Sequence, residues 1–278
     1  MIYNARELAR VRNPVLLLSA MTWILLVGQP GGVGMFVHCP ATKSQMPSPA
    51  SFQMLLAMNP PAYLAAAWSL MLVAMMSPVL IEPIRHIRLR SFTYRRARSI
   101  MLFVTGYAAI WMALGGVLLS IDLAAKLLPQ SYLVAGGMVL IASVWQFSPI
   151  KQRCLNRCHA HAELAAFGIA ADFDALRFGM THGIWCAGSC WALMLFPMVL
   201  PRGHVLAMAA VAVLIFSERL EQPTPPCWRW RGLGRAIRIV VVQARIRLQA
   251  LRLGPAPFAS RAQTWSTSRR MADGRYSQ

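Results

Sequence analysis

Residues 61–81 read PAYLAAAWSLMLVAMMSPVLI, and this uncharged apolar stretch decides the fold. A helix needs about 20 apolar residues to cross the hydrocarbon core of a bilayer. No water is present there to bond free backbone groups, so a crossing segment must form its hydrogen bonds internally, as a helix does. The stretch therefore predicts a transmembrane helix.

Five further apolar stretches are interpreted in the same way, over residues 14–37, 100–121, 132–147, 178–200 and 203–216. The first is broken by Gln29-Pro30-Gly31-Gly32 and, with Arg10 and Arg12 before it, also resembles a signal peptide. Cleavage would leave five spans in the same orientation, but no clear small-x-small site follows. We therefore predict an all-α protein, a polytopic membrane bundle of about six transmembrane helices.

The composition supports this interpretation. Charged residues make up 13% of the chain and hydrophobic residues 57%, with a mean hydropathy of +0.48, whereas a soluble domain carries about 25% charged residues. The formal net charge is nevertheless +19. Because these charges must lie outside the membrane, we expect the bilayer and its anionic headgroups as partners. No recognition motif accompanies the charge, so no nucleic acid is expected.

Basic residues alternate between the predicted loops, which predicts the orientation. Segments with almost no basic residues, which hold Lys43, Lys126 and Arg202, alternate with segments that hold many. The rich segments are the N-terminus, the second-to-third loop, the fourth-to-fifth loop and the tail, and contain Arg6, Arg10, Arg12, Arg85, Arg88, Arg90, Arg95, Arg96, Arg98, Lys151, Arg153, Arg157, Arg177 and Arg219. We expect both termini in the cytoplasm of a multi-pass cell-membrane protein, such as one of the bacterial inner membrane.

The chain changes character near residue 221. We predict a bundle over residues 1–221, with Glu218, Arg219 and Glu221 anchoring its last span at the interface, and a basic tail over residues 222–278. Residues 233–253 mix Ile, Val and Leu with Arg, which predicts an amphipathic helix lying on the inner membrane surface. A solvated helix or a helix that docks a partner is the alternative.

One face of the predicted helix over residues 178–200 carries soft metal ligands. His182, Cys186, Cys190 and Met194 recur at four-residue spacing, which places them on one edge of a helix. Imidazole, thiol and thioether groups are the ligands that select Cu(I) or Zn over hard cations. The alternative is that Cys186 to Cys190 form a small-residue packing face.

A second group of metal-ligand side chains follows the fourth predicted span. If that loop is helical, Cys154 and Cys158 share a face and His161 lies three residues further on. A cytoplasmic thiol pair is better interpreted as metal-binding or redox-active than as a structural disulfide. Ordinary reduced cysteines are the alternative.

Two further pairs lie on or beyond the second span. Met71 and Met75 share a helical face and could extend a copper path, although packing is the favoured explanation for them. Glu82 and His86 lie just past its inner end, four residues apart. They could supply oxygen and nitrogen ligands or form an ion pair at the helix end.

Four blocks of the sequence carry a family resemblance: WSLMLVAMMSP at 68–78, GYAAIW at 106–111, WQFSPIK at 145–151 followed by Cys154 and Cys158, and HGIWCAGSCWALM at 182–194 followed by Glu218-Arg219. With these blocks the chain resembles the DUF2182 family of predicted metal-binding integral membrane proteins. The resemblance covers roughly residues 60 to 221 and implies a metal-handling membrane protein, with copper the metal usually suspected.

Two departures from the family pattern bear on metal binding. The pattern resembles C-x-G-C-C-W, and Ser189 replaces its middle cysteine here, so a three-thiolate site would lose one ligand. A Met-Asn start to the last span is replaced by Gly203-His204-Val205.

Three functions are compatible with these patterns. The first is the binding, delivery or transport of copper, with a metal donor or acceptor protein as partner. The second is a membrane thiol-disulfide oxidoreductase, and the third is a non-catalytic membrane subunit or assembly factor. No nucleotide-binding motif is present, and we assign no catalytic residues.

Overall fold

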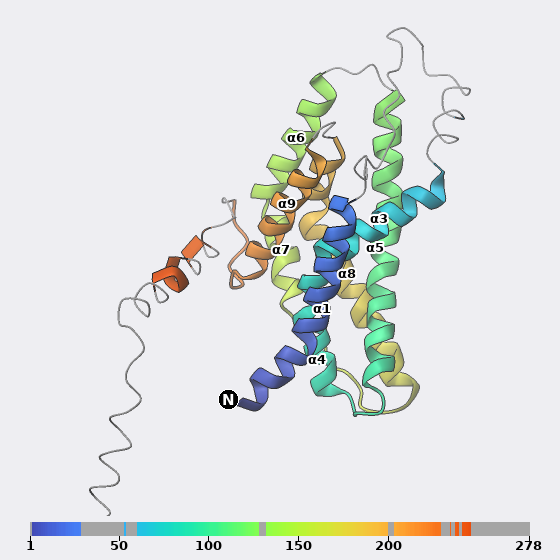
Figure 1. Ribbon diagram of the computed structural model, residues 1–278, viewed down its shortest axis with the longest axis vertical. Coiled ribbons are helices and arrows are strands. Elements are labelled where there is room, and N and C mark those ends of the chain that lie inside the picture. The colour runs from blue at the N-terminus through green and yellow to red at the C-terminus, as the bar shows by residue number, and fades with distance from the viewer. Residues whose placement is uncertain are drawn as a thin grey trace, which may run out of the picture. The chain divides into compact units, whose positions relative to one another are not determined.

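The computed structural model describes residues 2–28, 53, 60–127, 132–199, 203–228, 234, 237–238 and 241–245. Every regular element in these residues is helical, as predicted for an all-α protein (Figure 1). The elements are α1 (Ile2–Gly28), α3 (Pro61–Met76), η1 (Ser77–Leu80), α4 (Ile81–Arg90), α5 (Arg96–Leu127), α6 (Tyr132–Phe147), α7 (Pro149–Cys158), α8 (Gly168–Val199) and α9 (His204–Arg219).

Three helical stretches are long and apolar enough to cross a membrane: Glu7–Gly28, Pro61–Arg90 and Arg96–Ile121. They correspond to the first three predicted spans, although residues 29–37 lie outside the described part of the chain. The other predicted spans are helical but do not meet the combined requirement of length and hydropathy over the described residues. The count of six therefore stays a prediction.

Prolines interrupt the helical chain at two places, at Pro78 and at Pro149. Pro78 has no N–H to donate, and the helix tightens into the 3-10 turn η1 before it continues as the charged α4. Pro149 stands at the start of α7, where the Ser148 side chain accepts a hydrogen bond from the Ile150 backbone N–H. This break turns the chain between α6 and α7, and α7 then packs against α8.

Helix α8 is at the centre of the bundle and packs most extensively against α5. Glycines permit the close approach of these two backbones. A Cβ atom on Gly179 would stand 2.1 Å from the Phe103 carbonyl oxygen, and one on Gly106 would stand 2.6 Å from the Leu176 carbonyl oxygen. Small residues commonly bring helix backbones together in this way in membranes.

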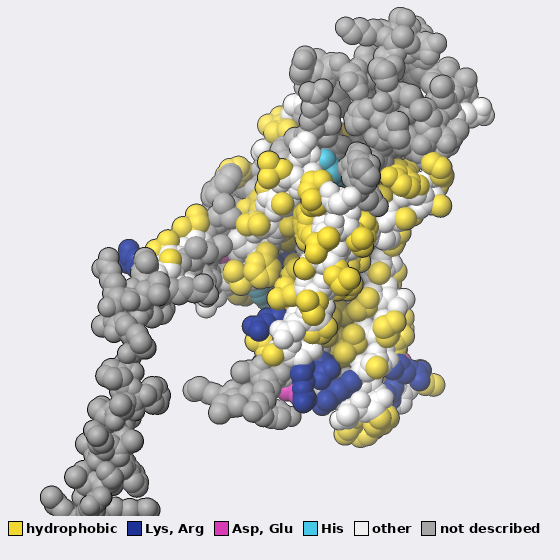
Figure 2. All heavy atoms as spheres, in the orientation of Figure 1, with side chains coloured by type: hydrophobic (Ala, Val, Ile, Leu, Met, Phe, Trp, Pro, Cys, Tyr) yellow, Lys and Arg dark blue, Asp and Glu magenta, His cyan; other side chains and the backbone are white. Residues whose placement is uncertain are grey.

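The outer surface of the bundle is apolar around its middle. Figure 2 shows hydrophobic side chains covering the middle of the visible face, with most of its Lys and Arg side chains gathered toward one end. Exposed apolar side chains on α1, α5, α8 and α9 include Leu17, Met21, Ile24, Met101, Val117, Ile184 and Val213. Contiguous exposed apolar surface marks a region that contacts lipid or another protein.

Ion pairs tie the helices together at one end of the bundle, which we call the basic end. Arg88 on α4 pairs with Glu7 on α1 at 3.4 Å, and Arg95 pairs with Asp172 on α8 at 2.6 Å. Arg98 reaches the other oxygen of the same aspartate at 2.7 Å. The basic end is the one that our orientation prediction places in the cytoplasm.

The chain divides into two units, Met1–Gly232 and Leu233–Gln278. In the second unit the described residues, 234, 237–238 and 241–245, are helical. They lie inside the predicted amphipathic helix over residues 233–253, whose remaining positions lie outside the described part. The predicted bundle boundary at residue 221 stays a prediction.

Candidate metal centre

The soft-ligand face of α8 points into the bundle. Cys186 and Met194 have no exposed side-chain surface, Cys190 is 1% exposed and His182 is 4% exposed. All four sit in the same interior because positions four apart share one helical face. The thiols therefore face other helices of this chain and not its outer surface.

The Cys186 sulfur lies where three helices meet. The Tyr107 hydroxyl on α5 is 3.3 Å from it, and Nη2 of Arg219 on α9 is 3.1 Å from it. The same Nη2 donates to the Ser189 hydroxyl oxygen at 3.1 Å. Cys190 donates its thiol proton to the Cys186 carbonyl oxygen at 2.9 Å. Helices α5, α8 and α9 thus form one polar site inside an apolar core.

Helix α7 brings the second predicted cysteine pair to this site. A Cβ atom on Gly188 would lie 2.9 Å from the Cys154 sulfur, so the missing side chain lets that thiol rest against α8. Cys158 interacts with Arg219 and with Cys186. The structure therefore brings the two cysteine pairs, far apart in sequence, around the Arg219 guanidinium.

Burial keeps the α7 thiols protonated when no metal is bound. It raises the pKa of the Cys154 thiol above its usual value. It also raises the pKa of Cys158 to about 12, although the nearby Arg219 opposes the shift. Metal binding at these thiols must therefore displace protons.

A buried ion pair holds α7 in place. Lys151 on α7 is fully buried, and its Nζ lies 2.8 Å from Oε1 of Glu218 on α9. Nζ also donates to the Gln146 side-chain oxygen at 2.5 Å, and the Gln146 amide contacts the same Glu218 oxygen. A buried charge is tolerated when it is paired and hydrogen-bonded in this way. Glu218 positions the cysteine-bearing helix, and Arg219 contacts the thiols.

Glu218 and Arg219 make contacts inside the bundle, and their predicted place at the membrane interface stays a prediction. Glu218 is 2% exposed, and both side chains turn inward toward α7 and α8. Sequence reasoning overlooked Lys151 as a buried residue. The available signal was a charged pair directly following the apolar residues of α9.

The predicted histidines occupy two environments. His182 packs among the rings of Phe103, Tyr107 and Phe178, with centroid distances of 6.0, 6.1 and 5.9 Å. His161 lies apart from these three aromatic rings, and its ring centroid is 4.7 Å from that of His86 on α4. Burial lowers the pKa of His161 and of its neighbour His159, which favours the neutral, metal-binding form of the ring.

Met71 and Met75 are 2% and 3% exposed and belong to the same buried cluster as Cys186, Cys190 and Met194. Helix packing explains this burial without a metal.

The predicted metal ligands lie in one region of the bundle but do not form a complete coordination sphere. Over the described residues, no three His, Cys, Asp or Glu side chains form a group that could hold a metal ion. Thiolate ligands nevertheless suit Cu(I), and two of them are enough for that ion. The chemistry of the donor set therefore fits copper better than a hard cation.

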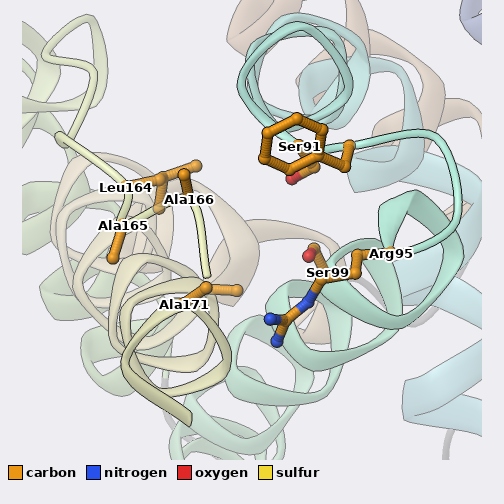
Figure 3. Close-up of a pocket in the computed structure, with 9 residues that line it drawn as sticks. Ser91, Arg95, Ser99, Leu164, Ala165, Ala166 and Ala171 are labelled. Carbon is orange, nitrogen blue, oxygen red and sulfur yellow. The ribbon is translucent and has the colours of Figure 1, made fainter. Parts of the chain in front are cut away.

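A small pocket lies apart from the thiols, near the basic end. Figure 3 shows Ser91, Arg95 and Ser99 on one side of it and Leu164, Ala165, Ala166 and Ala171 on the other. None of the predicted metal ligands lines it.

Comparison with known proteins adds a family assignment. Neither a curated protein nor a solved structure matches the chain. A family model described as "PpoB2: Copper chaperone" matches residues 65–242, which is more than half of the chain and includes every predicted metal ligand. The match supports the copper handling that the resemblance to DUF2182 implies. The chain therefore belongs to the PpoB2 copper chaperone family.

Proposed function

We propose that this protein is a membrane copper chaperone that binds Cu(I) between the thiols of α7 and α8 and exchanges it with a partner protein. The observation that carries the proposal is that thiols of both α7 and α8 lie near Arg219. Cys186 on α8 accepts a hydrogen bond from this guanidinium, and Cys158 on α7 lies close enough for its charge to affect the thiol. The cysteine pairs of α7 and α8 therefore lie near the same buried guanidinium.

The apolar surface supports the membrane part of the proposal. Three helical stretches are long and apolar enough to cross a bilayer, and the sides of the bundle expose large apolar residues. We propose six crossings with both termini in the cytoplasm, because basic residues alternate between the loops. The basic end would then face the cytosol and its anionic headgroups.

Charge balance suggests how the site would hold the ion. Cu(I) bound by two thiolates forms a complex with one net negative charge, and burying an unpaired charge is costly. Arg219 supplies one positive charge at hydrogen-bond distance from the Cys186 sulfur. Among the described residues its polar contacts are sulfur atoms and a hydroxyl group. The guanidinium would compensate the net negative charge of a copper complex formed beside it.

Metal analysis of the purified full chain tests the proposal. The protein would be isolated in detergent under reducing conditions, equilibrated with buffered Cu(I), and its copper measured per chain by mass spectrometry. We expect the apparent copper affinity to fall at least about tenfold in Cys186→Ser and in Cys158→Ser.

The exposed Cys227 supplies a matched control. Cys227→Ser removes a thiol outside the bundle core and should leave bound copper unchanged. Equal copper content in the wild type and in the Cys186, Cys158 and Cys227 variants would refute the proposal.

The oxidoreductase alternative requires these cysteines to form disulfides. In the structure Cys154, Cys158, Cys186 and Cys190 are free thiols. Redox-dependent alkylation in cells would detect such a cycle. The third alternative, a docking subunit without a metal, predicts normal function after both cysteine pairs are removed and loss of function when residues 228–254 are deleted.

A further inference from the structure

Two histidines from distant segments meet near the basic end. His86 lies on α4, and His161 lies in the segment between α7 and α8. Their ring centroids are 4.7 Å apart, and the ring planes are inclined at 47°. His161 is exposed and His86 is half-buried, so this pair can be reached from outside the bundle.

A backbone contact orients the His86 ring. Nε2 of His86 is 2.9 Å from the Ala162 carbonyl oxygen, which can only accept, so Nε2 carries the proton and Nδ1 keeps its lone pair. Metal-binding histidines almost always donate their other N–H to a carbonyl or a carboxylate in this way, which fixes the tautomer and the ring orientation.

A line of rings connects this pair to the buried thiols. The Phe178 ring lies 5.9 Å from His86 on one side and 5.9 Å from His182 on the other. His182 is 4% exposed, and its Nε2 has no hydrogen-bond partner among the described residues. It precedes Cys186 by one helical turn on the same face. Exposure thus decreases from His161 through His86 to His182.

We propose that His86 and His161 form a nitrogen-ligand receiving site that takes up Cu(I) near the basic end and passes it, by way of His182, to the thiols. This site rests on the proposed function, since it needs the thiols as the destination. Imidazole is a borderline ligand and thiolate a soft one, so Cu(I) gains affinity as it moves inward. The ion leaves two neutral imidazoles, two thiols bind it as thiolates, and their two protons are released to water.

The first arm of the test measures loading into intact thiols. The full chain in detergent is mixed with buffered Cu(I), and the appearance of sulfur ligands is followed by X-ray absorption on samples frozen over time. We expect His86→Gln/His161→Gln to load about tenfold more slowly than the wild type and to reach the same final content of sulfur-bound copper. His204→Gln, which alters a histidine whose Nδ1 contacts the Pro197 carbonyl, is the matched control and should load normally.

The second arm isolates the histidines. Serine replaces Cys154, Cys158, Cys186 and Cys190 together, glutamine replaces His182 in the same variant, and the copper that still binds should have nitrogen neighbours at about 2 Å. Adding His86→Gln/His161→Gln should abolish this binding. Unchanged loading in the first arm, or nitrogen-bound copper that persists without both histidines, would overturn the receiving site.

The two arms also separate this inference from the proposed function. Absence of sulfur-bound copper in the wild type would refute the thiol site and, with it, transfer from the histidines. Normal sulfur-bound copper together with unchanged loading in His86→Gln/His161→Gln would refute only the receiving site. The first arm keeps all native cysteines, so it remains decisive if the four-serine variant does not fold.

Discussion

Arg219 at the end of α9 donates a hydrogen bond to Cys186 on α8, with 3.1 Å between Nη2 and Sγ. A buried guanidinium is costly unless a negative charge lies near it. A Cu(I) ion bound by two thiolates carries one net negative charge and would provide that partner. The charge of Arg219 is therefore the property to test.

Replacing Arg219 separates a charge-balancing role from a purely structural one. Arg219→Gln should lower the apparent Cu(I) affinity by about 10- to 100-fold, as loss of a group next to a metal ligand typically does. Arg219→Lys keeps the charge and should retain more affinity than the Gln variant. Affinity would be measured by competition with a colorimetric Cu(I) chelator.

The metal-free protein provides the control for Arg219. If the residue served only to hold helices together, Arg219→Gln would lower the unfolding temperature without metal and leave Cu(I) affinity unchanged. We expect the opposite pattern, in which the metal-free stability changes little and copper stabilises the wild type more than the variant.

Local spacing made the metal-ligand face of α8 predictable. His182, Cys186, Cys190 and Met194 share an edge of any helix, whatever surrounds it. The partners of that edge were not predictable, because Arg219, Lys151 and Tyr107 reach it from other helices through long-range packing. A charged residue next to an apolar span usually lies at the interface. In Lys151 and Glu218 each buried charge is instead compensated by the other.

The Lys151–Glu218 pair should be essential for the placement of α7. Lys151→Met leaves Glu218 as an uncompensated buried carboxylate, which typically costs about 3–5 kcal/mol of stability. Replacing both residues, as Lys151→Met/Glu218→Leu, removes both charges and should recover much of that loss. Denaturant unfolding in mild detergent measures both variants. Equal stability of the wild type and Lys151→Met would show that the pair does not hold α7.

Gly188 should control the contact between α7 and α8. A Cβ atom there would meet the Cys154 sulfur at 2.9 Å, so Gly188→Ala should push α7 away from α8 and weaken copper binding about tenfold. Gly116→Ala on α5 is the matched control, since no atom lies within 4 Å of its added methyl group. Alanine there should leave copper binding intact and can stabilise the helix by up to about 1 kcal/mol. Similar copper affinities for the two variants would contradict this close contact.

The raised pKa of Cys158 predicts how its reactivity depends on pH. Only the thiolate reacts with iodoacetamide, and with a pKa of about 12 the thiolate fraction at pH 8 is on the order of one in ten thousand. In the metal-free protein, Cys158 alkylation should therefore be slow at pH 8 and rise about tenfold per pH unit to beyond pH 10. The exposed Cys227 provides a second thiol in the same sample for comparison.

Stability should follow the same titration. The folded state keeps the Cys158 proton to a higher pH than the unfolded chain, so the stabilisation that this group contributes is complete below pH 9 and is lost as the pH rises toward 12. Mass spectrometry of peptides from alkylated protein measures the reactivity, and Cys158→Ser should remove its part of the pH dependence of unfolding. Rapid alkylation of Cys158 at pH 8 would mean that the thiol is not enclosed between α7, α8 and Arg219 in the metal-free protein.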